Sequence, residues 1–182
     1  MSLLLIGTTG MLKSAAQQIA TDTHGDVVVL SRRASSFSFD DAALHSRTYT
    51  YDIDWADGPA FLSALDEIAA SHGPFAASLI WMHGRDEPLR SHISHQIAAD
   101  GTLIEVLGSA ASRPGALGEV RVRHMQGLPH VRYRQVLLGF VHDEGQSRWL
   151  THEEICEGAL QAFASDDRVT IAGQVEPWNL RP

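Results

Sequence analysis

The chain has 182 residues, of which 44% are hydrophobic and 20% are charged. This length and composition suit one globular domain spanning residues 1–182 with a sizeable core, and they exclude a disordered or fibrous protein. Fourteen basic residues against twenty-two acidic ones give a formal charge of -8, so a nucleic-acid partner is not expected.

Apolar runs of strand length recur along the chain. They predict strands over residues 2–6, 27–30, 47–53, 75–82, 102–107, 131–141 and 169–172. Helical spacing predicts helices between them, over residues 11–19, 40–44, 58–70 and 89–97, and a capping box at residues 151–154 opens another. Residues 109–130 show no clear pattern, and we interpret them as a loop with a short helix or strand.

The order of these elements predicts an α/β fold. Strands that alternate with helices form a parallel sheet with right-handed crossovers, and the second strand has no polar alternation, as expected when both faces of a sheet are covered. We therefore predict a doubly wound parallel sheet of about seven strands, the Rossmann NAD(P)-binding fold.

Neither a membrane anchor nor an oxidising compartment is indicated. The apolar residues 3–6 are too few for a signal peptide and are interrupted by Gly7, and no other stretch approaches the length of a membrane span. A single cysteine, Cys156, cannot form an internal disulfide, and its place on an apolar helix stripe predicts burial. We expect a cytoplasmic protein without a membrane partner.

Two glycines mark the first turn between a strand and a helix. Gly7 and Gly10 lie where glycine permits a tight turn, lets backbone N–H groups approach a pyrophosphate, and places that group at a helix N-terminus. The pattern predicts a dinucleotide phosphate site. An ordinary glycine-containing turn is the alternative.

Basic residues follow the second strand, where an acidic residue would bind the ribose hydroxyls of NAD. The chain has Ser31, Arg32 and Arg33 there, and arginine favours the 2′-phosphate of NADP, although a solvated basic loop remains the alternative. Lys13, the only lysine, opens the first helix, where the helix dipole opposes a cation. Either a bound phosphate compensates this charge or the side chain is solvated.

These residues resemble the short-chain dehydrogenase/reductase superfamily. The resemblance covers about the first 110 residues and rests on residues 4–12, the Ser31-Arg32-Arg33 strand end, Asp52-Ile53 and Gly108-Ser109. Within that superfamily the chain looks most like small bacterial Rossmann proteins, whose C-terminal signature resembles residues 133–136, 138–140 and 147–151.

The resemblance implies a cofactor site. Asp52 and Ile53 would approach the adenine, Met82, His83 and Gly84 would line the ribose, and Ser109 would occupy the place of a catalytic serine. The full set of expected cofactor-binding residues is Gly7, Thr8, Thr9, Gly10, Met11, Leu12, Ser31, Arg32, Arg33, Asp52, Ile53, Met82, His83 and Gly84.

Two departures from the family pattern matter. Lys13 replaces the usual third glycine, and the catalytic Tyr-x-x-x-Lys is absent because no lysine follows position 13. Tyr133 stands between two arginines, but on a strand these point to the opposite face, so they cannot replace the lysine that lowers the tyrosine pKa. Ser109, Tyr133 and His83 remain the candidate catalytic residues.

The histidines do not predict a metal site. His92 and His95 share a helix face, but no third ligand has a compelling spacing. His83, at a strand end, either donates to ribose or substrate or is a satisfied strand-end residue. Dispersed tryptophans suit core packing or a possible homo-oligomer interface.

Two functions remain open. The first is an NADPH-dependent oxidoreductase acting on a small activated acceptor, and the second is a non-catalytic NADP-binding or redox-sensing module. The missing proton relay favours the module, whereas the superfamily plan favours the enzyme.

Overall fold

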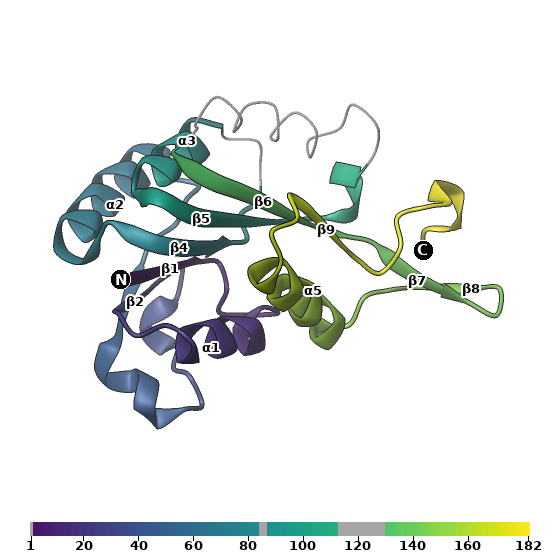
Figure 1. Ribbon diagram of the computed structural model, residues 1–182, viewed down its shortest axis with the longest axis horizontal. Coiled ribbons are helices and arrows are strands. Elements are labelled where there is room, and N and C mark those ends of the chain that lie inside the picture. The colour runs from purple at the N-terminus through teal and green to yellow at the C-terminus, as the bar shows by residue number, and fades with distance from the viewer. Residues whose placement is uncertain (1, 84–86, 113–129) are drawn as a thin grey trace.

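The computed structural model describes residues 2–83, 87–112 and 130–182 and shows a parallel sheet with helices on both faces (Figure 1). Seven strands lie in the order β3-β2-β1-β4-β5-β6-β9. Every neighbouring pair in this sheet is parallel. The arrangement is a doubly wound α/β sheet of the Rossmann type, which confirms the predicted fold class.

The elements have the following bounds. The sheet contains β1 (Ser2–Ile6), β2 (Val27–Ser31), β3 (Thr48–Asp52), β4 (Phe75–Ile80), β5 (Ile97–Leu107), β6 (Val131–Leu138) and β9 (Val169–Ala172). The described α-helices are α1 (Lys13–Thr21), α2 (Gly58–His72), α3 (Glu87–His95) and α5 (His152–Ala164). An antiparallel hairpin is formed by β7 (Phe140–Asp143) and β8 (Gln146–Trp149), and 3-10 turns cover Ala34–Ser36, Ala42–Arg47, Ser109–Ser112 and Trp178–Leu180.

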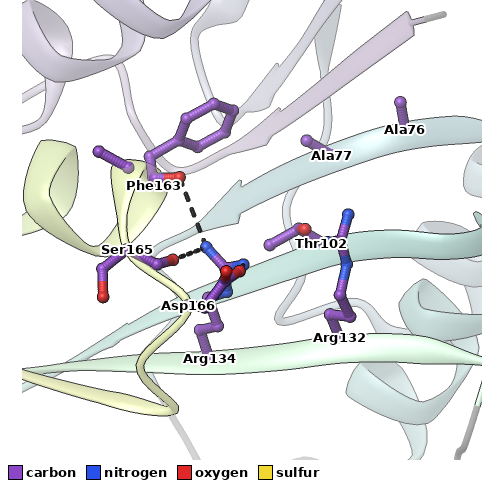
Figure 2. A pocket seen from close by; sticks show the side chains of 9 residues that line it. Ala76, Ala77, Thr102, Arg132, Arg134, Phe163, Ser165 and Asp166 are labelled. Carbon is purple, nitrogen blue, oxygen red and sulfur yellow. Dashed lines mark hydrogen bonds and ion pairs between the residues drawn. The ribbon is translucent and has the colours of Figure 1, made fainter.

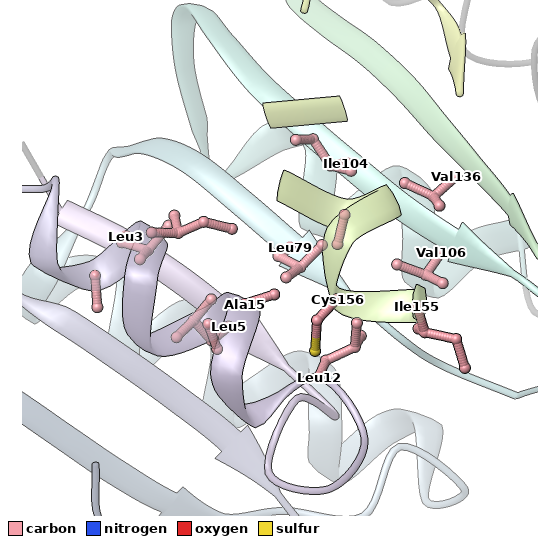
Figure 3. Close-up of a cluster of buried hydrophobic side chains, with 14 of the residues drawn as sticks. Leu3, Leu5, Leu12, Ala15, Leu79, Ile104, Val106, Val136, Ile155 and Cys156 are labelled. Atoms are coloured by element: carbon pink, nitrogen blue, oxygen red, sulfur yellow. The ribbon is translucent and has the colours of Figure 1, made fainter. Parts of the chain in front are cut away.

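The buried strands feed two separate cores because alternate side chains point to opposite faces of a sheet. Leu3 and Leu5 pack with α1 and α5 on one face, whereas Leu4 and Ile6 pack with α2 and α3 on the other. Figure 3 shows the first of these cores, in which Cys156 of α5 lies near the start of α1. Cys156 is buried, as predicted, and its thiol donates to the carbonyl of Met11.

The predicted sixth strand is two strands in the structure. The apolar run over 131–141 breaks at Gly139, where β6 leaves the sheet and β7 begins the hairpin. A Cβ at Gly139 would lie 2.1 Å from the carbonyl oxygen of Gln174, so the C-terminal segment crosses directly over this position. The prediction of a single long strand over residues 131–141 was wrong, because the close approach of a distant segment does not change the local pattern of hydrophobic residues.

The helix predicted over 89–97 ends earlier and gives way to a longer fifth strand. Ile97, which fits the helical spacing, begins β5 and pairs with Phe75 of β4. Its side chain joins the same core cluster as Leu89 and Ile93 of α3. A strand residue therefore fills the core position that the periodicity assigned to another turn of helix.

Several other expectations concern the less regular parts of the chain. The short helix expected over 40–44 is a 3-10 turn displaced to Ala42–Arg47. In the segment 109–130, the described part begins with the turn Ser109–Ser112, while residues 113–129 lie outside the described residues. Among the helices that the structure describes, none combines the length and the apolar character needed to cross a membrane.

Candidate functional site

The first glycine of the turn is required by the packing of two strands. Gly7 has a φ of +71°, and a Cβ there would lie 2.1 Å from the carbonyl oxygen of Trp81. The N–H of Gly7 donates to the carbonyl oxygen of Leu30 at 2.9 Å, and the N–H of Trp81 donates to the carbonyl oxygen of Ile6 at 2.8 Å. The end of β1 is therefore fixed between β2 and β4, and only glycine fits there.

The second glycine faces open space. A Cβ built on Gly10 meets no atom within 4 Å. The following helix α1 has no side-chain cap at its N-terminus, and Thr8, in the same turn, is fully buried with no hydrogen-bond partner for its hydroxyl among the described residues. An uncapped helix N-terminus, an unpaired hydroxyl and room beside the backbone fit a phosphate group.

The other residues of this turn have different surroundings. Leu12 is fully buried in the core, so its side chain packs against α5 and does not face outward. Met11 is half-buried beside the same core. The Thr9 hydroxyl donates to the Ser31 hydroxyl at 3.3 Å, which joins the turn to the end of β2.

The end of β2 presents two exposed arginines. Arg32 and Arg33 both lie at the surface, and neither forms an ion pair with another described residue. Ser31, just before them, is buried, and its carbonyl accepts from the N–H of Ile53 at 2.9 Å. The two guanidinium groups are therefore available to an anionic ligand at this edge of the sheet.

Asp52 holds the serine-rich loop that follows these arginines. Its carboxylate accepts from the N–H of Ser35 at 2.7 Å and from the Ser35 hydroxyl at 2.6 Å. The hydroxyl bond, followed by the backbone bond, lowers the pKa of Asp52 below its usual value. The carboxylate thus fixes the loop itself.

Lys13 has a protein partner. Its ammonium lies 2.7 Å from a carboxylate oxygen of Asp40. Asp40 thus compensates the cation at the start of α1, an arrangement that the two sequence-based alternatives did not include.

Two further strand ends lie at the same edge. Met82 is buried after β4, while His83 is exposed, and its ring packs edge-on against Trp81 with 4.8 Å between centroids. Ser109 starts the turn that follows β5. Because the carboxyl ends of parallel strands share one edge, His83 and Ser109 lie on the edge that carries the glycine turn. Gly84 lies outside the described residues.

Tyr133 is placed differently from the other candidates. It is the third residue of β6 and pairs in register with Leu103, well before the carboxyl end of the strand. Its hydroxyl donates to a carboxylate oxygen of Glu105 at 2.7 Å. The structure therefore places Tyr133 in a polar network on one face of the sheet, and not at the carboxyl edge where His83 and Ser109 lie.

This network is a buried ion pair that the sequence did not predict. Arg90 of α3 lies 2.6 Å from Glu105 of β5, and the two side chains are 3% and 1% exposed. Arg90 also donates to the carbonyl of Met82 at 3.0 Å, and Gln135 donates to the Tyr133 hydroxyl at 3.1 Å. The one signal in the sequence is the carboxylate of Glu105 within the otherwise apolar run from Leu103 to Leu107.

The histidines of α3 do not form a metal site in the described part of the chain. No group of three potential ligands occurs among these residues. His92 instead lies 2.6 Å from Asp66 of α2, and the ring of His95 stacks on that of His130.

Comparison with known proteins identifies the class of fold. No family model and no curated protein sequence matches the chain. Among solved structures, a short-chain dehydrogenase/reductase described as glucose/ribitol dehydrogenase from Brucella melitensis superposes with a TM-score of 0.68 at 13% identity, over 96% of this chain and 95% of that one. A metagenomic short-chain oxidoreductase in complex with NADP gives 0.68 at 13% identity, over 94% and 95%. Carveol dehydrogenase from Mycobacterium avium, in complex with NAD, gives 0.59 at 13% identity, over 94% and 96%.

The fold is thus that of short-chain dehydrogenase/reductase structures. The resemblance predicted from the sequence is confirmed at this level, over almost the whole chain.

Proposed function

We propose that the chain binds NADP(H) at the carboxyl edge of its sheet and reduces a small activated acceptor. The observation that carries the proposal is the turn at Gly10, where open space, an uncapped helix and the buried Thr8 hydroxyl fit a phosphate. Solved structures of the same fold include complexes with NADP and with NAD. The exposed Arg32 and Arg33 favour NADP, because a guanidinium binds a phosphate by charge and by paired hydrogen bonds.

The residues at this edge divide the work as follows. The start of α1 and Thr8 would hold the pyrophosphate, and the two arginines would hold the 2′-phosphate. The cofactor, when bound, supplies the hydride. His83 and Ser109 carry the hydrogen-bonding side chains that could orient an acceptor beside it.

The acceptor class follows from the state of Tyr133. Its hydroxyl is bonded to Glu105, and the chain has no lysine beyond position 13 to assist it in proton transfer. Oxidation of an ordinary alcohol needs a base that removes the hydroxyl proton, whereas the reduced form of a quinone or a conjugated carbonyl can be protonated by water. We therefore propose that the substrates are activated acceptors, such as quinones and conjugated carbonyls, and not ordinary alcohols.

The same observation favours a second function. If no acceptor is reduced, the engagement of Tyr133 with Glu105 suits a non-catalytic NADP-binding or redox-sensing module. A cytoplasmic location, a single domain and a homo-oligomer stay predictions.

Replacing Gly10 tests the phosphate site directly. Gly10→Val adds a branched side chain where no protein atom lies within 4 Å, so the variant should fold normally and lose cofactor binding. Calorimetric titration with NADP measures the loss, and circular dichroism confirms the fold. Normal NADP binding by folded Gly10→Val would refute the site.

Replacing the two arginines tests the preference for NADP. In the same titration, the double variant Arg32→Ala with Arg33→Ala should weaken NADP binding by about 2–4 kcal/mol and NAD binding much less.

An acceptor panel separates the two functions. With NADPH, we expect the protein to reduce quinones and conjugated carbonyls, and with NADP we expect little oxidation of secondary alcohols. The reduction of these acceptors should survive Tyr133→Phe. Rapid alcohol oxidation would contradict the assigned acceptor class. Tight NADP binding without activity on any acceptor would establish the non-catalytic module.

A further inference from the structure

A pocket of about 350 Å³ opens at the opposite edge of the sheet, under the C-terminal end of α5 (Figure 2). It lies near the amino ends of β4 and β6, whereas the glycine turn follows the carboxyl end of β1. Its volume is within the range of small-ligand sites. It is lined by Ala76, Ala77, Thr102, Arg132, Arg134, Phe163, Ala164, Ser165 and Asp166.

Two arginines reach this pocket from one strand. Arg132 and Arg134 are two residues apart on β6, so both side chains lie on the same face of the sheet. Figure 2 shows both rising from β6 beside Thr102 of β5. Both arginines therefore bring positive charge to one place in a chain whose formal charge is -8 overall.

Arg134 has a structural task. It is buried and donates to the carbonyl oxygens of Ala162 at 3.0 Å and Phe163 at 3.4 Å, and also to that of Ser165. Its guanidinium lies 2.7 Å from the carboxylate of Asp166. The C-terminal carbonyls of α5 and this carboxylate together offset its charge.

Arg132 has no such partner. It is exposed, and no hydrogen bond or ion pair joins its guanidinium to another described residue. Thr102 lies directly opposite in the register of β5 and β6 and is 8% exposed, and its hydroxyl likewise has no hydrogen bond to a described residue. Within the described residues, the pocket thus combines one cation without an ion-pair partner and an adjacent hydroxyl without a hydrogen bond.

The rest of the lining limits what could bind. Ala76, Ala77 and Phe163 give the pocket an apolar side that suits a short hydrocarbon group. The Asp166 carboxylate and the negative end of the α5 dipole lie beside the arginines and would repel a second negative charge. The lining therefore suits a monoanion better than a dianion.

We propose that this pocket is a second ligand site, which binds a small molecule with one carboxylate and a short apolar body. The carboxylate would pair with the Arg132 guanidinium through two hydrogen bonds and accept from the Thr102 hydroxyl. The apolar body would lie against the alanines and Phe163. The site is independent of the dinucleotide site.

Butyrate is a suitable probe, and nuclear magnetic resonance of ¹⁵N-labelled protein at constant chloride follows its binding. Saturable shifts are expected for the amides of Thr102, Ala164 and Ser165. Arg132→Gln should weaken binding at least tenfold, and Thr102→Val should weaken it severalfold. Arg181→Gln is the matched control, because this exposed arginine stacks on Trp178 away from the pocket, and it should bind butyrate as the wild type does.

Three outcomes would overturn the proposal. They are the absence of saturable shifts at these amides, equal binding by the Arg132→Gln variant, and tighter binding of inorganic phosphate than of butyrate. Because Arg132 is exposed and Arg134 is unchanged, the Arg132→Gln variant keeps the contacts that end α5 and should fold.

Discussion

Arg90 and Arg134 are both buried, and each binds a carboxylate as well as at least one backbone carbonyl oxygen, but the two carboxylates differ in their surroundings. Glu105, the partner of Arg90, is 1% exposed, whereas Asp166, the partner of Arg134, is 94% exposed. The two distances are nearly equal, at 2.6 and 2.7 Å. Distance alone therefore does not reveal what each pair contributes to stability.

The surroundings decide the contribution of each pair. Both charges of the Arg90 pair have been removed from water, so losing one takes away the opposite charge that faces the other inside the protein. The Asp166 carboxylate keeps its water, and its attraction to Arg134 is weakened by solvent. For Arg134 the important partners are the carbonyl oxygens at the end of α5, which no other described side chain satisfies.

Removing the buried carboxylate should have the largest effect. Glu105→Gln keeps the shape of the side chain but removes the carboxylate that faces the buried Arg90 guanidinium, so we expect the free energy of unfolding to fall by about 3–5 kcal/mol. Urea denaturation measures this loss. The double variant Arg90→Met with Glu105→Met removes both charges and should be more stable than Glu105→Gln. A loss below about 1 kcal/mol for Glu105→Gln would contradict the ionic interpretation of the pair.

Replacing Arg134 should have an intermediate effect. Arg134→Met retains an apolar stem in the core but withdraws the donors from the last carbonyls of α5, at a cost of about 2–3 kcal/mol. Hydrogen exchange of the amides in the last turn of α5 should accelerate, while exchange in β1 stays slow. Unchanged exchange at the end of α5 would show that water replaces the guanidinium there.

Removing the exposed carboxylate should have the smallest effect. Asp166→Asn is expected to lower the free energy of unfolding by about 0–1 kcal/mol, and less in high salt, because the carboxylate is solvated. The same denaturation assay at low and high salt measures both values. A loss as large as that of Glu105→Gln would remove the distinction between the two pairs.

Much of the fold could be predicted because its signals are local. The run Val27 to Leu30 is continuously apolar, which is typical of a parallel strand covered on both faces. Gly7 and Gly10 stand at a boundary between strand and helix, and the structure places a turn there in which Gly10 is exposed. The capping box at Thr151 and Glu154 is present as the sequence predicted.

The missed contacts depend on residues far apart in the chain. Nothing near Glu105 indicates that an arginine of α3 will face it, and nothing near Lys13 indicates Asp40. The break at Gly139 depends on the C-terminal segment that crosses it. Such pairings are set by how helices and strands pack, which periodicity does not encode.

The strand order also bears on how the chain folds during synthesis. After β4 joins β1, every later strand of the sheet pairs with the sheet strand made just before it: β5 with β4, β6 with β5, and β9 with β6. Domains begin to fold from the N-terminus as the chain emerges from the ribosome, so the sheet can grow outward in one direction. A nascent chain that ends after β4 already contains β2 and β4, the two neighbours of β1 in the sheet. The core between α1 and α5 can close only after α5 has been made, close to the end of synthesis.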